Sequence, residues 1–230
     1  MIFRQLFECQ SCTYSYLLAK RSGGEAVIID PVKEEVPRYL QLIRELNVQL
    51  VFAIDTHLHA DHITGLGQLR ETTQCATLMG QQTKAECVSH RVRDGEVITV
   101  DGMKLTAMYT PGHTDDSYSY LVNDTVFTGD TLLIRSTGRT DFQNGDPRVQ
   151  YDSIFQRLLK LPDETIVRPA HDYKGWTVST IGEERLHNPR LQVASVDEYV
   201  AIMNNLNLAN PKMMDVAIPA NLKCGMRYRK

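Results

Sequence analysis

The chain has 230 residues and a formal net charge of −3, with 25 Lys and Arg against 28 Asp and Glu. Positive and negative residues are interspersed, so the clustered positive charge that binds a phosphate backbone is missing, and we expect no nucleic-acid partner. A hydrophobic content of 42% and a charged content of 23% are typical of a globular protein that is long enough to bury a substantial core.

The N-terminal residues 1–6 lack the basic and apolar regions of a secretory signal, and no apolar stretch approaches the roughly 20 residues of a membrane span. We therefore expect a cytoplasmic protein that does not enter a membrane. Five cysteines, an odd number scattered through the chain, favour reduced thiols over a disulfide framework. Cys9 and Cys12 form a CxxC, which on its own is weak evidence for a zinc or redox site.

The first part of the chain predicts an antiparallel meander that leads into a helix. We expect strands at residues 2–7, 14–20 and 25–30, with turn residues between the last two. From Lys33 to Leu46 the apolar residues recur at helical spacing. The apolar run 50–54 then predicts a strand, and this strand-helix-strand unit favours a sheet covered by helices.

The rest of the chain predicts further strands and then helices. We expect a helix from about Ile63, a short strand at 75–79, a turn or short helix at 81–86, and hairpins formed by 96–100 with 103–109 and by 117–122 with 125–129. We also expect helices at 149–160, 179–187 and 195–205 and a strand at 165–169. Residues 135–147 are polar and irregular, as in a substrate loop. This order suggests two layers of sheet between helices, in one domain over residues 1–230.

Four potential metal ligands follow the strand 50–54, namely His57, His59, Asp61 and His62. Imidazole and carboxylate together suit zinc, iron, manganese or nickel. A helix that begins after His62 would place its positive end near Asp61, which favours the carboxylate. This stretch therefore predicts a metal site whose metal the stretch itself leaves open.

Three further candidates lie at the ends of predicted strands or in the loops that follow them: His113, Asp130 and His171. Loops at one edge of a rigid sheet can bring such separated residues together. His90 and His187 stand alone, and we expect them to be exposed or hydrogen-bonded side chains.

The pattern His57-x-His59-x-Asp61-His62, followed by His113, Asp130 and His171, resembles the metallo-beta-lactamase superfamily. That resemblance implies a four-layer αββα sandwich with metals at one edge of its two sheets. It also implies that His57, His59 and His113 surround one metal position. Asp61, His62 and His171 would surround a second, with Asp130 able to bridge the two.

Longer stretches resemble a narrower family, the persulfide dioxygenases, which are similar to the glyoxalase II branch of the superfamily. These stretches are residues 133–143, 171–180, 183–185, 188–190 and 218–225, so that the resemblance covers nearly the whole chain. It implies one ferrous iron per chain, bound by His57, His113 and Asp130 as a 2-His-1-carboxylate site with open positions for substrate and dioxygen. His59, Asp61, His62 and His171 would orient these ligands or hydrogen-bond to substrate and oxygen. The length leaves no room for the rhodanese domain that some members carry.

The activity implied by this resemblance is the oxidation of glutathione persulfide by O2 and water to sulfite and glutathione, in sulfide detoxification. Glutathione carries two carboxylates and an ammonium, so its pocket should offer cationic groups. We expect Arg139 to serve this purpose, because its loop follows the Asp130 strand. Tyr173 matches the glutathione-binding tyrosine of the related thioesterases, and Lys174 is adjacent to it.

Two other functions remain open at this point. A binuclear zinc hydrolase of the glyoxalase II type, which cleaves a glutathione thioester, would use all seven ligand positions. A structural zinc site ranks last, because such sites are closed and rich in cysteine. The sequence also leaves the oligomeric state open, a homo-oligomer included.

Overall fold

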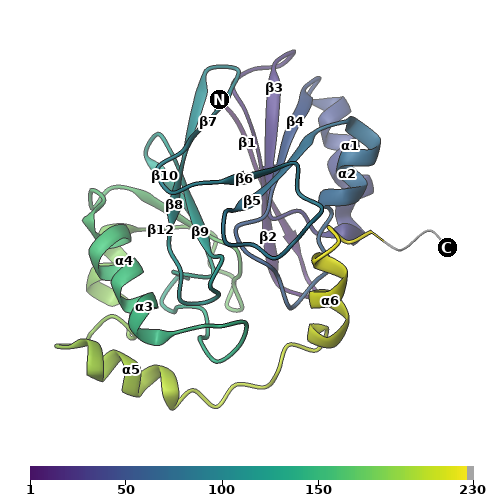
Figure 1. Ribbon diagram of the computed structural model, residues 1–230. Helices are drawn as coiled ribbons and strands as arrows, with labels where there is room; N and C mark the ends of the chain where they lie inside the picture. Colours follow the sequence, from purple (N-terminus) through teal and green to yellow (C-terminus); the bar gives the residue numbers. More distant parts are fainter. Residues whose placement is uncertain (227–230) are drawn as a thin grey trace.

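Two six-stranded sheets stack face to face in the computed structural model, which describes residues 1–226 (Figure 1). The first sheet contains β1 (Ile2–Glu8), β2 (Thr13–Ala19), β3 (Glu25–Ile29), β4 (Gln49–Ile54), β5 (Ala76–Gly80) and β6 (His90–Val92), in that order. The second has the order β12 (Ser179–Thr180), β11 (Ile166–Pro169), β10 (Thr125–Gly129), β9 (Tyr118–Val122), β8 (Met103–Tyr109) and β7 (Val97–Val100). The sequence predicts all of these strands except β6 and β12, which are too short to show an alternating pattern.

The first sheet is antiparallel from β1 to β3 and parallel from β3 to β6. The parallel part follows from the connections, because parallel neighbours need a crossover. Helix α1 (Val36–Glu45), entered through a 3-10 turn at Lys33–Glu35, joins β3 to β4, and α2 (Leu66–Thr73) joins β4 to β5. The helix expected from Ile63 begins three residues later, because residues up to Thr64 are held in a loop described below.

Tight turns and one crossover set the register of the second sheet. Asp101 and Gly102 both have positive φ, of 46° and 79°, as the two central residues of a type I′ hairpin require, and they join β7 to β8. Another two-residue turn, at residues 123–124, joins β9 to β10, and there Asn123 has a positive φ of 54°. β10 and β11 are parallel, joined by the helical region 147–160, which comprises α3 (Pro147–Asp152), a π-helical turn (Ser153–Arg157) and a 3-10 turn (Leu158–Lys160).

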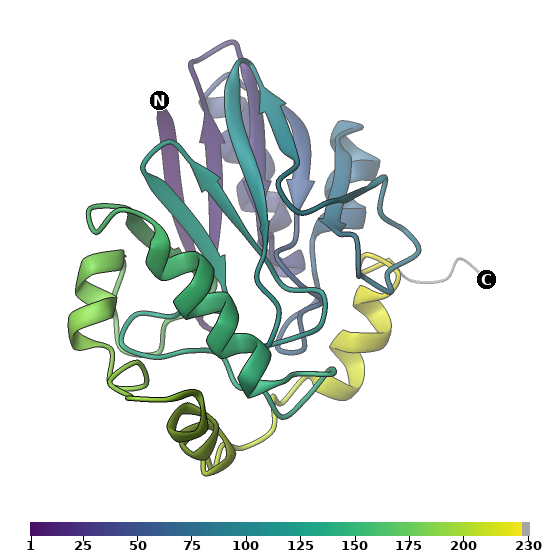
Figure 2. The same cartoon turned by 60° about the vertical axis from the view of Figure 1, so that its left-hand side comes forward.

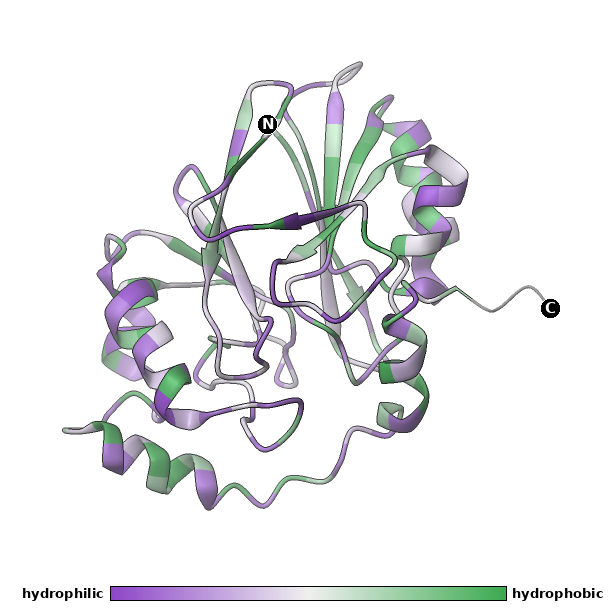
Figure 3. Ribbon diagram, in the orientation of Figure 1, coloured by the Kyte–Doolittle hydropathy of each residue, from purple (hydrophilic) through white to green (hydrophobic). Residues whose placement is uncertain are grey.

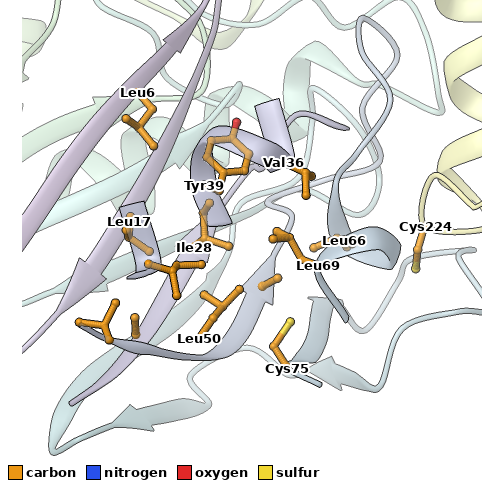
Figure 4. Close-up of a cluster of buried hydrophobic side chains, with 14 of the residues drawn as sticks. Leu6, Leu17, Ile28, Val36, Tyr39, Leu50, Leu66, Leu69, Cys75 and Cys224 are labelled. Atoms are coloured by element: carbon orange, nitrogen blue, oxygen red, sulfur yellow. The ribbon is translucent and has the colours of Figure 1, made fainter. Parts of the chain in front are cut away.

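Three apolar clusters separate the layers. Alternate residues of β2 show this directly, since Tyr16 and Leu18 point between the two sheets while Leu17 points toward α1 and α2. The layer under α1 and α2 is drawn in Figure 4. On the outer face of the second sheet, a third cluster packs under α3, α4 (Ile181–His187) and α5 (Val196–Asn204). Figure 2 shows these green helices on the opposite side from α1 and α2, and Figure 3 shows hydrophobic residues concentrated along the strands. The predicted αββα sandwich is therefore confirmed.

Two features differ from the sequence-based expectations. A sixth helix, α6 (Met214–Asn221), forms near the C-terminus and packs back on the first sheet layer. Cys87 and Cys224 form a disulfide, with their Cα atoms 5.9 Å apart, so the expectation of reduced thiols is wrong for this pair. The fold brings together two cysteines that are 137 residues apart, which their scatter in the sequence did not reveal. Cys9, Cys12 and Cys75 are free thiols. Within residues 1–226, no helix combines the length and apolar character that crossing a bilayer would need.

Candidate metal centre

Four strand ends bring the candidate ligands together. His57 follows β4, His113 lies between β8 and β9, Asp130 directly follows β10, and His171 follows β11. His57, His113 and Asp130 each offer one ligand atom, and these three atoms lie within 4.8 Å of one another. His59, Asp61 and His62 form a second such group beside them. The structure thus places in one cluster all seven positions that the sequence singled out, because His171 contacts both groups.

Neighbouring oxygens fix the ring orientation of His57 and His113. The Thr56 hydroxyl donates to Asp30 Oδ2 at 3.0 Å, so it accepts from His57 Nδ1, also at 3.0 Å. His113 Nδ1 lies 2.6 Å from the backbone oxygen of Arg139, which can only accept, so this nitrogen carries the proton. In both rings Nε2 therefore carries the lone pair that can coordinate a metal ion. Holding the second nitrogen in this way orients a histidine for metal binding.

His59 and His62 show the same arrangement in the second group. His59 Nε2 lies 3.1 Å from Asp30 Oδ1, and His62 Nδ1 lies 2.9 Å from Asp61 Oδ2. The opposite nitrogens, His59 Nδ1 and His62 Nε2, are buried without a hydrogen-bond partner in the described part of the chain. Buried nitrogens seldom stay unpaired, so these two atoms fit ligands or bound water.

His171 joins the two groups through both ring nitrogens. Nδ1 lies 2.6 Å from Asp130 Oδ1, and Nε2 lies 2.7 Å from Asp61 Oδ2. Burial lowers the pKa of His171, but the two carboxylates outweigh burial and hold that pKa well above its ordinary value. Burial acts in the opposite direction on Asp130 and raises the pKa of its carboxyl. His171 and His113 outweigh this effect, so the pKa of Asp130 lies below its ordinary value and the carboxyl is ionised. Burial and the neighbouring histidines keep the pKa of His57 well below its ordinary value, which leaves this ring neutral.

Gly138 permits the close approach of two candidate ligands. Its N–H donates to the backbone oxygen of Asp130 at 2.7 Å. A Cβ at this position would lie 2.2 Å from that oxygen and 2.8 Å from His113 Nδ1. The loop that follows β10 can therefore press against both residues only because residue 138 has no side chain.

A cavity of about 890 Å³ opens onto the cluster, and its walls include the loop at 208–213. This volume suits a small peptide-like ligand. Arg139 lines the cavity, but its guanidinium pairs with Asp141 at 2.6 Å and donates to the backbone oxygens of Leu208 and Ala209. Arg139 therefore has a structural role, since it holds the 208–213 loop beside the site, and its role in glutathione recognition stays a prediction.

Arg190 and Lys212 also line the cavity, and the sequence reasoning missed both. Arg190 donates only to the backbone oxygen and hydroxyl of Thr137, so within the described chain no carboxylate pairs with it. Burial lowers the pKa of Arg190, but a guanidinium stays charged at neutral pH. Of the other predicted contacts, Tyr173 lines the cavity and stacks on His171 with ring centroids 6.1 Å apart, whereas Lys174 is exposed and is not among the described lining residues.

Two more residues were missed although they support the cluster. Asp30 directly follows β3 and contacts both Thr56 and His59, and its place after an apolar strand was the available signal. The hydroxyl of Thr13 lies 3.3 Å from Asp61 Oδ2 and from His62 Nδ1 and 3.1 Å from His171 Nε2. No sequence signal marks Thr13, because it comes from a strand far from the ligand motifs. His90 is exposed and lies 2.6 Å from Glu96, as expected of an isolated histidine.

Comparisons with known proteins agree with this geometry. The model of the metallo-beta-lactamase superfamily matches residues 13–171. The chain is similar to a Homo sapiens protein named persulfide dioxygenase ETHE1, mitochondrial, with 46% identity over 230 residues that cover 99% of this chain and 90% of the human protein. The mouse protein of that name is 45% identical with the same coverage.

Solved structures show the same relationship. The crystal structure of ETHE1 from Myxococcus xanthus superposes with a TM-score of 0.96 and 52% identity, and covers 98% of this chain and 100% of that one. A metallo-beta-lactamase from Staphylococcus aureus gives a TM-score of 0.90 at 24% identity, covering 100% of this chain and 74% of that one. At that identity the second match supports the fold alone.

Proposed function

The chain belongs to the metallo-beta-lactamase superfamily and, within it, to the persulfide dioxygenase family, and from this membership we propose that it oxidises glutathione persulfide. One persulfide, one O2 and one water give one glutathione and one sulfite, with release of two protons. Both atoms of dioxygen and the oxygen of water end on the outer sulfur. The glutathione thioester hydrolase, the alternative drawn from the sequence, receives no support from these relatives.

The observation that carries the proposal is the cluster of His57, His113 and Asp130, with three donor atoms within 4.8 Å. Two imidazoles and one carboxylate form the donor set of non-haem iron oxygenases, and the oriented Nε2 atoms of both histidines fit this set. We infer one Fe(II) per chain at these residues. When bound, ferrous iron supplies the redox chemistry that allows dioxygen to react with a persulfide.

The remaining residues of the cluster orient and charge the site. His171 holds one oxygen of Asp130, so the other oxygen, 3.6 Å from His113 Nε2, faces the donor atoms. Asp30 holds His59 and, through Thr56, His57. We propose that His59, Asp61, His62 and His171 serve in this way and as hydrogen-bond partners of substrate, rather than as ligands of the iron.

The cavity supports glutathione as the carrier of the persulfide sulfur. Arg190 and Lys212 are cations at its wall without a carboxylate partner in residues 1–226, and glutathione brings two carboxylates. Arg139 and Tyr173 remain proposed contacts of glutathione. Lys174 is proposed only as a contact outside the cavity, because it is exposed and is not among the described residues that line the cavity wall. Glu34, an exposed carboxylate at the same cavity, is placed to meet the glutathione ammonium.

The test is a metal and oxygen balance on the purified chain. Iron-loaded protein and freshly made glutathione persulfide should consume one O2 for each sulfite formed, with about one iron per chain. Apoprotein loaded with zinc is the control and should consume none. Two zinc ions per chain, with thioester cleavage that persists without oxygen, would contradict the proposal.

The single domain over residues 1–230 and the cytoplasmic location belong to this proposal too, and limited proteolysis and cell fractionation test them.

A further inference from the structure

The loop that carries His57, His59 and His62 depends on outside partners for its backbone hydrogen bonds. It lies between β4 and α2 and contains no regular structure. Buried backbone oxygens must still be paired. Gln143 donates to the backbone oxygen of Leu58 at 2.6 Å. The N–H of Leu58 donates to Asp116 Oδ1 at 3.3 Å, and the backbone oxygen of Ile63 accepts from the N–H of Lys33 at 2.8 Å. Three further hydrogen bonds come from α6, more than 150 residues further along the chain.

Asn221, the last residue of α6, uses its whole amide on this loop. Its Nδ2 donates to the backbone oxygens of His59 and His62, at 2.9 and 2.8 Å. Its Oδ1 accepts from the backbone N–H of Thr64 at 2.9 Å. The side chain is 2% exposed, so water does not replace these bonds. Asn221 thus spans the loop from a candidate ligand residue to the start of α2.

Few contacts hold α6 itself in place. The helix has eight residues with Pro219 inside it, and a long irregular segment precedes it. Ala217 is buried, and Ile218 and Leu222 pack partly buried beside the cluster that contains Leu66 and Leu69. A short helix with so few buried residues gains little stability from packing, so we expect α6 to open more easily than the other helices.

The disulfide provides the additional anchor. Cys224, three residues after Asn221, is joined to Cys87 in the loop between β5 and β6. Figure 4 shows Cys224 entering the cluster from the C-terminal segment, beside Leu66 and Leu69 of α2. The backbone oxygen of Cys224 accepts from Gly67 N–H at 2.9 Å, and the backbone oxygen of Cys87 accepts from Arg70 of α2. The disulfide therefore ties the end of α6 to the loop between β5 and β6, and both cysteines also contact α2, the helix that follows the metal loop.

We propose that Asn221 is a positioning residue for the metal loop, residues 57–66. We also propose that the Cys87–Cys224 disulfide is a thiol-sensitive tie that keeps Asn221 in place against this loop. The reductant is a low-molecular-weight thiol such as glutathione. Its thiolate attacks one sulfur, which forms a mixed disulfide and releases the other cysteine. A second thiolate attacks the mixed disulfide, which releases the oxidised thiol pair and the second cysteine. Each freed cysteinate takes up a proton. Cys87 is half-buried whereas Cys224 is 1% exposed, so we expect the thiolate to attack the sulfur of Cys87.

The first experiment measures the loop in the metal-free chain. Asn221→Ala removes all three bonds, whereas Asn221→Asp keeps the acceptor for Thr64 and loses both donors. Amide hydrogen exchange of a peptide that covers residues 57–66 should be at least about tenfold faster in Asn221→Ala, because three hydrogen bonds of the loop are lost. In Asn221→Asp the amide of Thr64 should stay protected. Asn204→Ala, an exposed change on α5, is the matched control. Exchange equal to that of this control in both variants would overturn the role of Asn221.

The second experiment addresses the tie. Protein isolated without reductant should show three free thiols after denaturation and five after reduction, as five cysteines with one disulfide require. Reduction by glutathione, or Cys87→Ser, should accelerate both loop exchange and iron release to a chelator several-fold. In Asn221→Ala, reduction should increase the rates of loop exchange and iron release only slightly further, because the disulfide acts on the loop through Asn221. Five thiols in the unreduced protein, or an unchanged exchange rate after reduction, would overturn the tie.

The iron-release measurement rests on the metal site of the proposed function, but thiol counts and exchange in metal-free protein do not. If the chain bound zinc or lacked dioxygenase activity, these two readouts would still decide the inference. If they failed in an active iron enzyme, only the inference would fall.

Discussion

His171 Nδ1 lies 2.6 Å from Asp130 Oδ1, and this contact leaves Asp130 Oδ2 as the oxygen that faces His113 Nε2 at 3.6 Å. A histidine that the two-metal pattern would assign as a ligand thus orients Asp130, a carboxylate ligand in the proposed single-iron arrangement. The predictions below test this division of the cluster and the cavity beside it.

Replacing His171 with Ala should weaken iron binding about 10–100-fold, the usual effect of losing a hydrogen-bond partner of a metal ligand. Asp130 would lose its fixed orientation, and Asp61 would lose a charged partner. Chelator competition monitored by iron content measures the change. His90→Ala, which removes an exposed histidine, is the control. An unchanged iron affinity in the His171 variant would show that Asp130 needs no such support.

His113→Ala and His59→Ala should differ in iron content. His113 belongs to the proposed iron ligands, so its loss should leave well under one iron per chain and little oxygen uptake. His59 belongs to the second group, so His59→Ala should retain most of its iron while turnover falls. Iron analysis of the two purified variants, with circular dichroism to check folding, decides the matter. Equal loss of iron in both would argue against a site made of His57, His113 and Asp130 alone.

Gly138→Ala should reduce turnover about 100-fold, because a ligand misplaced by about 1 Å can have that effect. The added Cβ would lie 2.2 Å from the backbone oxygen of Asp130, so the loop, His113 or both must move. Gly95→Ala is the matched control, since a Cβ there meets no atom within 4 Å and only its φ of 76° is strained. Oxygen uptake under saturating substrate measures the effect. Similar losses in the two variants would mean that close packing at Gly138 does not matter.

Arg190→Gln should raise KM for glutathione persulfide about tenfold or more with a smaller change in kcat, because a charge-assisted contact contributes about 1.5–3 kcal/mol. The variant keeps a donor for Thr137, so folding should persist. A small uncharged persulfide should be oxidised equally by both proteins. Arg148→Gln removes an exposed arginine paired with Asp197 and serves as control. An equal loss of kcat/KM for both substrates would mean that Arg190 supports the loop that contains Thr137 and does not recognise glutathione.

Stability should fall at alkaline pH through buried tyrosines such as Tyr39. Burial raises the pKa of Tyr39 from 10.0 to about 12, although its contacts with Ser15 and Val32 act in the opposite direction. A group whose pKa is higher in the folded state contributes stability that is complete below pH 10 and is lost as pH rises toward 12. This contribution amounts to about 3 kcal/mol. Thermal unfolding between pH 8 and 12 should show the loss, and Tyr39→Phe should reduce its steepness. A flat profile would mean that Tyr39 ionises freely.

Local pattern was enough to predict much of this protein. The alternation of residues 14–20, the helical spacing after Lys33 and the hairpin residues Asp101 and Gly102 act over a few neighbouring positions, and each element formed as predicted. The motif from His57 to His62 identified the superfamily for the same reason, since its ligands are adjacent in sequence. Very short strands such as β6 were not predicted, because three residues are too few to show an alternating pattern.

Only the tertiary structure decided which distant groups complete the centre. Thr13, Asp30 and Asn221 contact the ligand cluster from β2, from the residue after β3 and from α6. Nothing in the neighbouring residues marks Thr13 or Asn221, and the apolar strand before Asp30 does not reveal its partners. The Cys87–Cys224 disulfide and the hydrogen bonds of Arg139 to the 208–209 backbone depend equally on packing. The physical reason is that a hydrogen bond or disulfide between residues far apart in the sequence depends on how the layers stack, and the two-sheet core sets that stacking as a whole.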